Sequence, residues 1–134
     1  MTELDQFIAD WKDNDTHTKK AFEELLAHVK TLDKTEMEFI SRPNVSYSVR
    51  PRHLEQKKRS LFAMVDVIDD DPQERWLSIC FYGEMITDPD ETGDLIPGGL
   101  LGEDGYCFDL DAYDADEIAY IKQRLTQAHD NAPD

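Results

Sequence analysis

Two strongly apolar runs, separated by a short charged turn, constrain the fold more than any other feature of this sequence. The runs are SLFAMVDVI at residues 60–68 and WLSICFY at residues 76–82, and the intervening DDDPQE is charged and contains a proline. Apolar runs of this length between turn residues are typical of buried strands. We therefore predict that the two runs are neighbouring antiparallel strands at the centre of a sheet.

Helical periodicity is evident before these strands. Apolar residues recur at helical spacing in residues 2–12, where Thr2 and Asp5 approximate a capping box, so a short amphipathic helix is predicted there. A longer helix follows, with Asp15, Thr16 or Thr18 as its cap. Its apolar stripe consists of Phe22, Leu25, Leu26, Val29 and Leu32, with His28 beside it as a packing or edge residue.

A third helix is predicted near the C-terminus. It begins at about Asp114, because Asp114 and Glu117 match a helix-capping pattern. Its apolar face consists of Ile118, Ile121, Leu125 and Ala128. A loose tail is predicted for the residues that follow, 129–134.

The remaining strands are indicated by a period of two. Apolar residues alternate with polar ones at 37–39 and 45–49, with a turn at 42–44, which predicts a hairpin. Pro51 is expected to end the second strand, because proline cannot donate a hydrogen bond to a sheet. A last strand is predicted at 106–110.

This order of elements predicts one α+β domain spanning residues 1–134. The expected architecture is an antiparallel sheet of four to five strands, with two N-terminal helices and one C-terminal helix over one face. The start, MTELDQFIADWK, lacks the basic residues and continuous apolar stretch of a signal peptide, so a cytoplasmic location is expected.

Charge is both high and segregated. The chain has a formal net charge of −16, which argues against nucleic-acid and anionic-membrane partners, because their phosphates would be repelled. Residues 42–60 are basic, whereas residues 66–117 contain seventeen carboxylates and one base, Arg75. The two segments either neutralise each other within the fold or leave an acidic surface for a basic partner or a cation.

All six glycines lie in residues 83–105, together with Pro89 and Pro97. We expect a long connection here, which is either a functional loop or a set of tight turns around a short extra hairpin. Four residues, Asp88, Asp90, Thr92 and Gly93, match positions 1, 3, 5 and 6 of an EF-hand loop. Position twelve is a glycine, which argues against a genuine EF-hand, and the remaining alternative is a looser divalent-cation site formed by Asp88, Asp90 and Asp94.

The sequence contains no motif for a catalytic, metal or cofactor site. The four histidines are scattered without metal-ligand spacing, and there is no nucleophile elbow. Cys80 and Cys107 lie in apolar runs without a CxxC pattern, so they are expected to be reduced, buried thiols that pack as small hydrophobes. No cofactor is predicted, and an enzyme is not favoured.

Four stretches, VSYSVRP, LFAMVDV, WLSICFYG and GEDGYCFDLD, occur in an order that resembles small bacterial α+β families described only as domains of unknown function. In those families an N-terminal helix leads into an antiparallel sheet that a C-terminal helix closes. The resemblance implies a bacterial cytoplasmic protein and transfers no catalytic residue.

Two functional hypotheses follow. The first is an acidic binding or accessory module that engages a basic protein surface through its glycine-rich segment and residues 109–117. The second is a small-ligand-binding protein or enzyme with a cleft between the sheet and residues 83–105. The candidate binding residues for the two hypotheses are Asp88, Asp90, Glu91, Asp94, Glu103, Asp104, Tyr47, Arg50, Arg52, Trp76, Tyr82 and Glu84.

Overall fold

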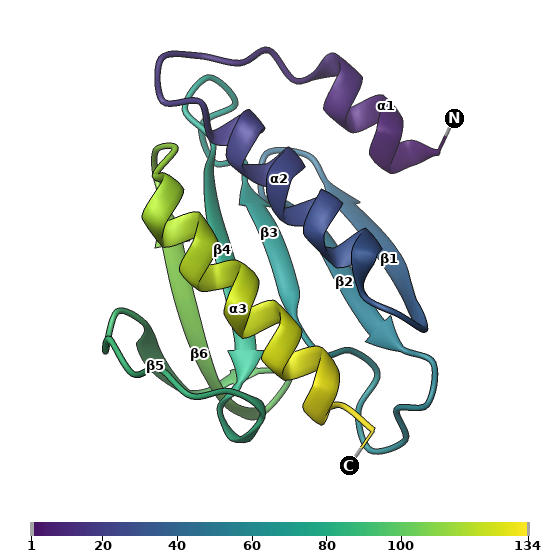
Figure 1. Ribbon diagram of the computed structural model, residues 1–134. Helices are drawn as coiled ribbons and strands as arrows, with labels where there is room; N and C mark the ends of the chain where they lie inside the picture. Colours follow the sequence, from purple (N-terminus) through teal and green to yellow (C-terminus); the bar gives the residue numbers. More distant parts are fainter. Residues whose placement is uncertain (1, 134) are drawn as a thin grey trace.

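The computed structural model of the chain describes residues 2–133. Its elements are α1 (Glu3–Asp10), α2 (Thr18–Thr31), β1 (Thr35–Arg42), β2 (Ser46–His53), β3 (Met64–Ile68), β4 (Trp76–Tyr82), the 3-10 helix η1 (Gly83–Met85), β5 (Asp94–Leu100), β6 (Glu103–Leu110) and α3 (Ala115–Asn131). Figure 1 shows α2 and α3 lying across one face of a single sheet. Within residues 2–133, every helix is too short or too polar to cross a membrane.

The sheet has the strand order β1-β2-β3-β4-β6-β5, and all neighbouring strands are antiparallel. The predicted central pair is confirmed, because β3 and β4 are aligned from Met64 opposite Cys80 to Ile68 opposite Trp76. The α+β class is also confirmed. The sheet has six strands, however, whereas four to five were predicted.

The additional strand is β5, which lies inside residues 83–105, where either a functional loop or tight turns around a short extra hairpin were expected. It forms a hairpin with β6, in which Asp94 is opposite Cys107 and Ile96 is opposite Gly105, and the register then shifts before Leu100. Pro97 lies within this irregular stretch. Proline and glycine are poor strand residues, but an edge strand tolerates them at a bulge. Figure 1 shows β5 at the outer edge of the sheet.

Pro51 does not end β2, in contrast to the prediction. The strand continues to His53, and Pro51 lies opposite Met37 of β1. The last register pair between β2 and β3 is Val49 with Val65, and the Pro51 carbonyl accepts a hydrogen bond from the amide of Phe62 beyond it. The missing N–H of the proline therefore falls where the sheet needs no donor.

Helix capping matches the prediction at two of the three helices. Thr2 and Asp5 form the capping box of α1, and Asp114 accepts hydrogen bonds from the amides of Asp116 and Glu117 at the start of α3. The residue before α2 is instead His17, which has a left-handed backbone (φ 57°) and no side-chain cap.

The three predicted caps of α2 therefore do not cap the helix. The Thr18 hydroxyl donates to the carbonyl of Arg75 at 3.0 Å, and the Thr16 hydroxyl donates to Asn14 Oδ1 at 2.6 Å. Tertiary contacts with the β3–β4 turn thus take the place of local capping at this end of α2.

The core lies between the sheet and the helices. The predicted apolar face of α3 is entirely buried, and the stripe of α2 is buried except for half-buried Leu32. The largest fully buried side chains are Phe22, Phe62, Phe81, Phe108, Leu25, Leu61, Leu77, Ile79, Leu100, Ile121, Leu125 and Val29. Their burial supplies the main stabilising free energy of the domain.

The predicted tail is helical through Asn131. His129 is buried there, and its Nε2 donates to the carbonyl of Asp33 at 2.6 Å. Its ring lies 4.8 Å from that of His53 and 5.7 Å from that of Phe62. These contacts fix the end of α3 against the loop after β2.

Candidate functional site

One face of the sheet is covered by α2 and α3, and the opposite face, here called the open face, is not covered by a helix of residues 2–133. In β4, Leu77 and Ile79 point to the helices and are fully buried, whereas Ser78 and Cys80 are half-buried on the open face. The strand register places a row of polar residues across the open face: Ser48, Asp66, Ser78 and Asp109. The centre of the open face is therefore polar.

Asp66 occupies the middle of that row. Burial raises the pKa of its carboxyl above the ordinary value of 3.8, against the opposing effects of a hydrogen bond to Ser48 and the charges of Arg50 and Arg42. Its Oδ1 atom is buried and has no hydrogen-bond partner among residues 2–133. The ionised form of Asp66 is therefore disfavoured in the folded protein.

We expect Asp66→Asn to raise the free energy of unfolding at pH 7. A raised folded-state pKa means that the folded protein binds more protons than the unfolded chain, so wild-type stability falls as pH rises through the window above 3.8. Asparagine has the same shape and no charge, so the variant loses this pH dependence. Urea unfolding at pH 7 and pH 4 measures it, with the exposed Asp109→Asn as control. Equal stability of D66N and wild type at pH 7 would contradict the assignment.

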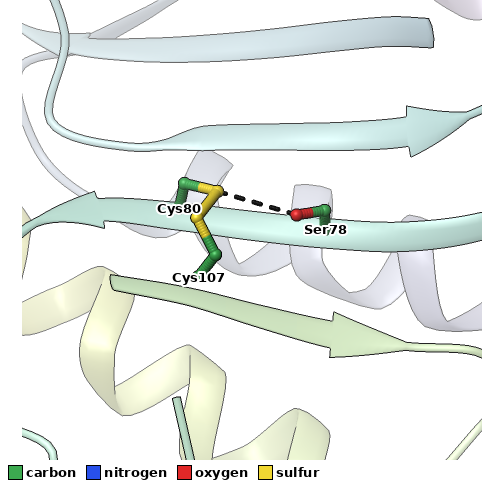
Figure 2. The surroundings of a disulfide bond; sticks show 3 residues. All are labelled: Ser78, Cys80 and Cys107. Atoms are coloured by element: carbon green, nitrogen blue, oxygen red, sulfur yellow. Dashed lines mark hydrogen bonds between the residues drawn. A yellow bond between two sulfur atoms is a disulfide. The ribbon is translucent and has the colours of Figure 1, made fainter. Parts of the chain in front are cut away.

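Cys80 of β4 and Cys107 of β6 are directly opposite each other on the open face and form a disulfide, with their Cα atoms 4.1 Å apart. This finding corrects the prediction of reduced, buried thiols, because both residues are paired and half-buried. Figure 2 shows the pair on the side of the sheet away from the helices, with the Ser78 hydroxyl 3.6 Å from Cys80 Sγ. The apolar character of both strands comes from the residues that face the helices.

A second feature is an open hollow of about 690 Å³ where β4 ends and β6 begins. Arg59 forms ion pairs with Glu84 and, at 2.7 Å, with Glu103, and its guanidinium lies 4.4 Å from the ring centre of Tyr82. Hydrogen bonding to Glu103 raises the pKa of Arg59, and hydrogen bonding to Arg59 lowers the pKa of Glu84 and of Glu103. Arg59 is 10% exposed and is thus held firmly between these groups.

The hollow has a net negative charge. Its lining includes one base, Arg59, and three acids, Glu84, Glu103 and Asp104, so the formal charge of these groups is −2. Tyr82 and Tyr106 supply aromatic walls. Carboxylates combined with aromatic rings favour a cationic group over an anionic one.

The hairpin next to the hollow carries exposed acidic and apolar side chains. Three of the five exposed large hydrophobic residues of the described chain lie here, namely Leu95, Ile96 and Leu101, with exposed fractions of 51%, 41% and 57%. We define the hairpin surface as the exposed residues Asp90, Glu91, Asp94, Leu95, Ile96, Leu101 and Asp104. No Lys, Arg or His within residues 2–133 lies within ion-pair distance of its carboxylates.

Asp88 has a structural role beside this surface. Its carboxyl accepts hydrogen bonds from the amides of Thr92 and Gly93 and from the Tyr120 hydroxyl of α3. Burial by itself would raise the pKa of Asp88, but the hydrogen bonds outweigh this effect, so the pKa is lowered. The partial EF-hand pattern therefore corresponds to a turn that Asp88 closes on its own backbone. Within residues 2–133, no group of three or more His, Cys, Asp and Glu side chains is placed to hold a metal ion.

The structure separates the residues that were grouped for the cleft hypothesis. Tyr82 and Glu84 lie in the hollow, but Arg50 and Arg52 lie beside Glu36 and Glu38 of β1 in another depression of about 260 Å³. The other two candidates for this cleft, Tyr47 and Trp76, also lie outside the hollow.

Tyr47 stacks on Phe7 with ring centres 4.0 Å apart, and Trp76 lies beside Arg75 and Asp111 near the start of α2. Neither residue lines the hollow beside β5 and β6. The sheet is too wide for all six candidates to meet in one cleft.

The basic and acidic segments neutralise each other only in part. Arg59 is the one residue of segment 42–60 that forms an ion pair with segment 66–117 among residues 2–133. Arg52 pairs with Glu36 at 2.6 Å, and Arg75 pairs with Asp69 at 2.6 Å. Most carboxylates of the acidic segment therefore have no ion-pair partner among residues 2–133.

Three important residues were missing from the candidate set, namely Arg59, Tyr106 and Asp66. Arg59 is part of a basic run whose spacing does not show which base is nearly buried. Asp66 could have been identified from the sequence, because it is the one charged residue inside the apolar run SLFAMVDVI. An isolated carboxylate in a central strand is unusual and indicates a polar position on one face.

No protein-family model, no curated protein and no solved structure matches this chain.

Proposed function

We propose that this protein is a binding module whose hairpin surface and adjacent hollow bind a basic, partly apolar segment of another protein. The observation that carries the proposal is the combination, on one hairpin, of exposed Leu95, Ile96 and Leu101 with carboxylates that have no ion-pair partner within residues 2–133. Exposed apolar side chains close to charged ones are common at interaction sites.

Charge complementarity selects the partner. Residues 88–104 contain six carboxylates and no Lys or Arg, so a basic segment is attracted and an acidic one is repelled. The apolar side chains supply contact area that does not depend on salt. The expected partner therefore alternates cationic and apolar residues.

The hollow suits one cationic side chain of such a segment. Within it, Arg59 already shows how a guanidinium is held, between two carboxylates and over the ring of Tyr82. Asp104 and Tyr106 line the same hollow. Asp104 makes no ion pair with a base of residues 2–133. We propose that a partner Lys or Arg contacts these two residues.

We expect the triple variant D90N/E91Q/D94N to bind a basic probe peptide about tenfold more weakly than wild type, which corresponds to about 1.4 kcal/mol. The probe is a fluorescent peptide alternating Arg with Leu, and a peptide alternating Glu with Leu is its counterpart. Wild-type affinity for the basic probe should fall as salt rises, and the triple variant should show a weaker salt dependence. Fluorescence anisotropy at 50 and 300 mM salt measures both effects.

The matched control is D15N/E23Q/D70N, which removes three exposed carboxylates that lie outside the hairpin of β5 and β6. Asp88 is retained in both variants because its hydrogen bonds hold the turn. Equal weakening in both triple variants, or equal affinity for the Glu-containing peptide, would show that only net charge matters and would refute the proposal. Binding of a small organic cation in the hollow without any peptide binding would support the small-ligand alternative.

A further inference from the structure

We propose that Cys80 and Cys107 form a thiol–disulfide exchange site that is reduced and re-formed while the protein stays folded. The reacting partners are small dithiols or thiols in one direction and small disulfides in the other. This chemistry is separate from peptide binding at the hairpin surface.

The position of the pair gives a reagent access. Both residues are half-buried on the open face, on the side of the sheet away from α2 and α3 (Figure 2). Cys107 also lies near the edge of the sheet, because only β5 separates β6 from solvent on that side. Exchange rates depend on such access to the attacked sulfur.

The fold does not depend on the cross-link to keep β4 and β6 together. Six register pairs join the strands, from Leu77 opposite Leu110 to Tyr82 opposite Gly105. On the covered face, Phe81 of β4 packs edge-to-face on Phe108 of β6, with ring centres 5.8 Å apart. The reduced protein therefore keeps the same sheet.

The two sulfurs have different surroundings, which sets the direction of attack. The Ser78 hydroxyl is 3.6 Å from Cys80 Sγ and can donate a hydrogen bond to a thiolate there. Cys80 is therefore the better leaving group, and Cys107 is the sulfur attacked.

Reduction of the disulfide takes two steps. A reductant thiolate attacks Cys107 Sγ, the bond between the two protein sulfurs breaks, and Cys80 leaves as a thiolate that takes up a proton. The second thiol of the dithiol then attacks its own sulfur of the mixed disulfide and releases Cys107 as a thiol. The dithiol is oxidised to a cyclic disulfide, and the two cysteines are reduced. A small disulfide reverses the reaction and is itself reduced to two thiols.

The first test follows the reduction of the folded protein by dithiothreitol, with alkylation and mass spectrometry at intervals. We expect the rate to rise in proportion to the reductant concentration and the circular dichroism spectrum to be retained. Oxidised glutathione should then restore the disulfide. A rate that levels off at the global unfolding rate, or purified protein whose free thiols do not close with oxidised glutathione, would overturn the proposal.

The second test examines the roles of Cys107 and Ser78. With glutathione as reductant, the mixed disulfide should map to Cys107. We expect Ser78→Ala to slow reduction about threefold, if loss of the hydrogen bond raises the leaving-group pKa by about one unit. Ser48→Ala, a serine change on the same face without contact to either sulfur, is the control. Mapping of glutathione to Cys80, or equal rates for S78A and S48A, would overturn the assigned direction.

Discussion

Replacing Arg75 with alanine is expected to destabilise the protein by about 3–5 kcal/mol, because it leaves a buried carboxylate without its counter-charge. The partner, Asp69, is 2% exposed, and its Oδ1 accepts a hydrogen bond from Arg75 Nε at 2.6 Å. The other carboxyl oxygen accepts the amide hydrogen of Asn44 at 2.7 Å. Removing the arginine would thus also weaken the support of the β1–β2 turn.

The stacking of Arg75 on aromatic rings adds to this effect. Its guanidinium lies 5.1 Å from the ring centre of Phe7, 5.4 Å from that of Trp11 and 5.3 Å from that of Tyr47. Each such contact contributes a fraction of a kcal/mol up to about 2 kcal/mol when it is shielded from water. Arg75 therefore joins α1, β2 and the β3–β4 turn through a single side chain.

Urea unfolding of R75A, with R52A as the matched control, measures the effect. Arg52 makes an equally short ion pair with Glu36, but the two side chains are 37% and 58% exposed, so its loss should cost less than about 1 kcal/mol. The double variant R75M/D69N should recover part of the lost stability, because no buried charge remains. A cost for R75A no larger than that for R52A would show that the pair contributes little.

Predicting the elements from the sequence succeeded where periodicity was strong and local. The runs that became β3 and β4 and the stripe of α3 needed only their own residues to be recognised, since each buries one continuous apolar surface. The predicted cap of α2 was wrong, because the Thr18 hydroxyl donates its hydrogen bond to the carbonyl of Arg75, 57 residues away. A local pattern cannot contain that contact.

The candidate site was harder to predict, because it depends on which side of a strand each residue occupies. The cysteines illustrate this point, since the alternation that would place them on the open face is hidden by the apolar content of the runs. The hollow was predicted only in part. Tyr82, Glu84, Glu103 and Asp104 were among the candidates, whereas Arg59, which organises them, comes from a loop between β2 and β3.

The hairpin surface itself depends on Phe108, a core residue of β6. Phe108 of β6 is 1% exposed, and its ring lies 5.8 Å from that of Phe81 and 6.0 Å from that of Tyr120 on α3. The backbone turn at residues 88–93 rests on the same ring, because a Cβ atom added at Gly93 would lie 2.8 Å from it. The phenyl ring thus fills the space between the sheet, α3 and the base of the hairpin.

We expect Phe108→Ala to lower the free energy of unfolding by about 3–5 kcal/mol, through lost burial and the cavity that remains. Phe108→Leu should cost clearly less, because most of the volume is kept. The turn at 88–93 should also exchange its amide hydrogens faster in F108A, since its support is lost. Urea unfolding and hydrogen exchange measure the two effects.

Leu95→Ala is the matched control, because Leu95 lies on the adjacent strand and is 51% exposed. Its replacement should change stability by less than about 0.5 kcal/mol, as expected for a solvated surface position. If F108A and L95A had similar stability, the ring could not be the support of the hairpin, and the hairpin surface would need another anchor. If F108A were unstable but exchange at 88–93 were unchanged relative to β3, the turn would be held by Asp88 and Tyr120 alone.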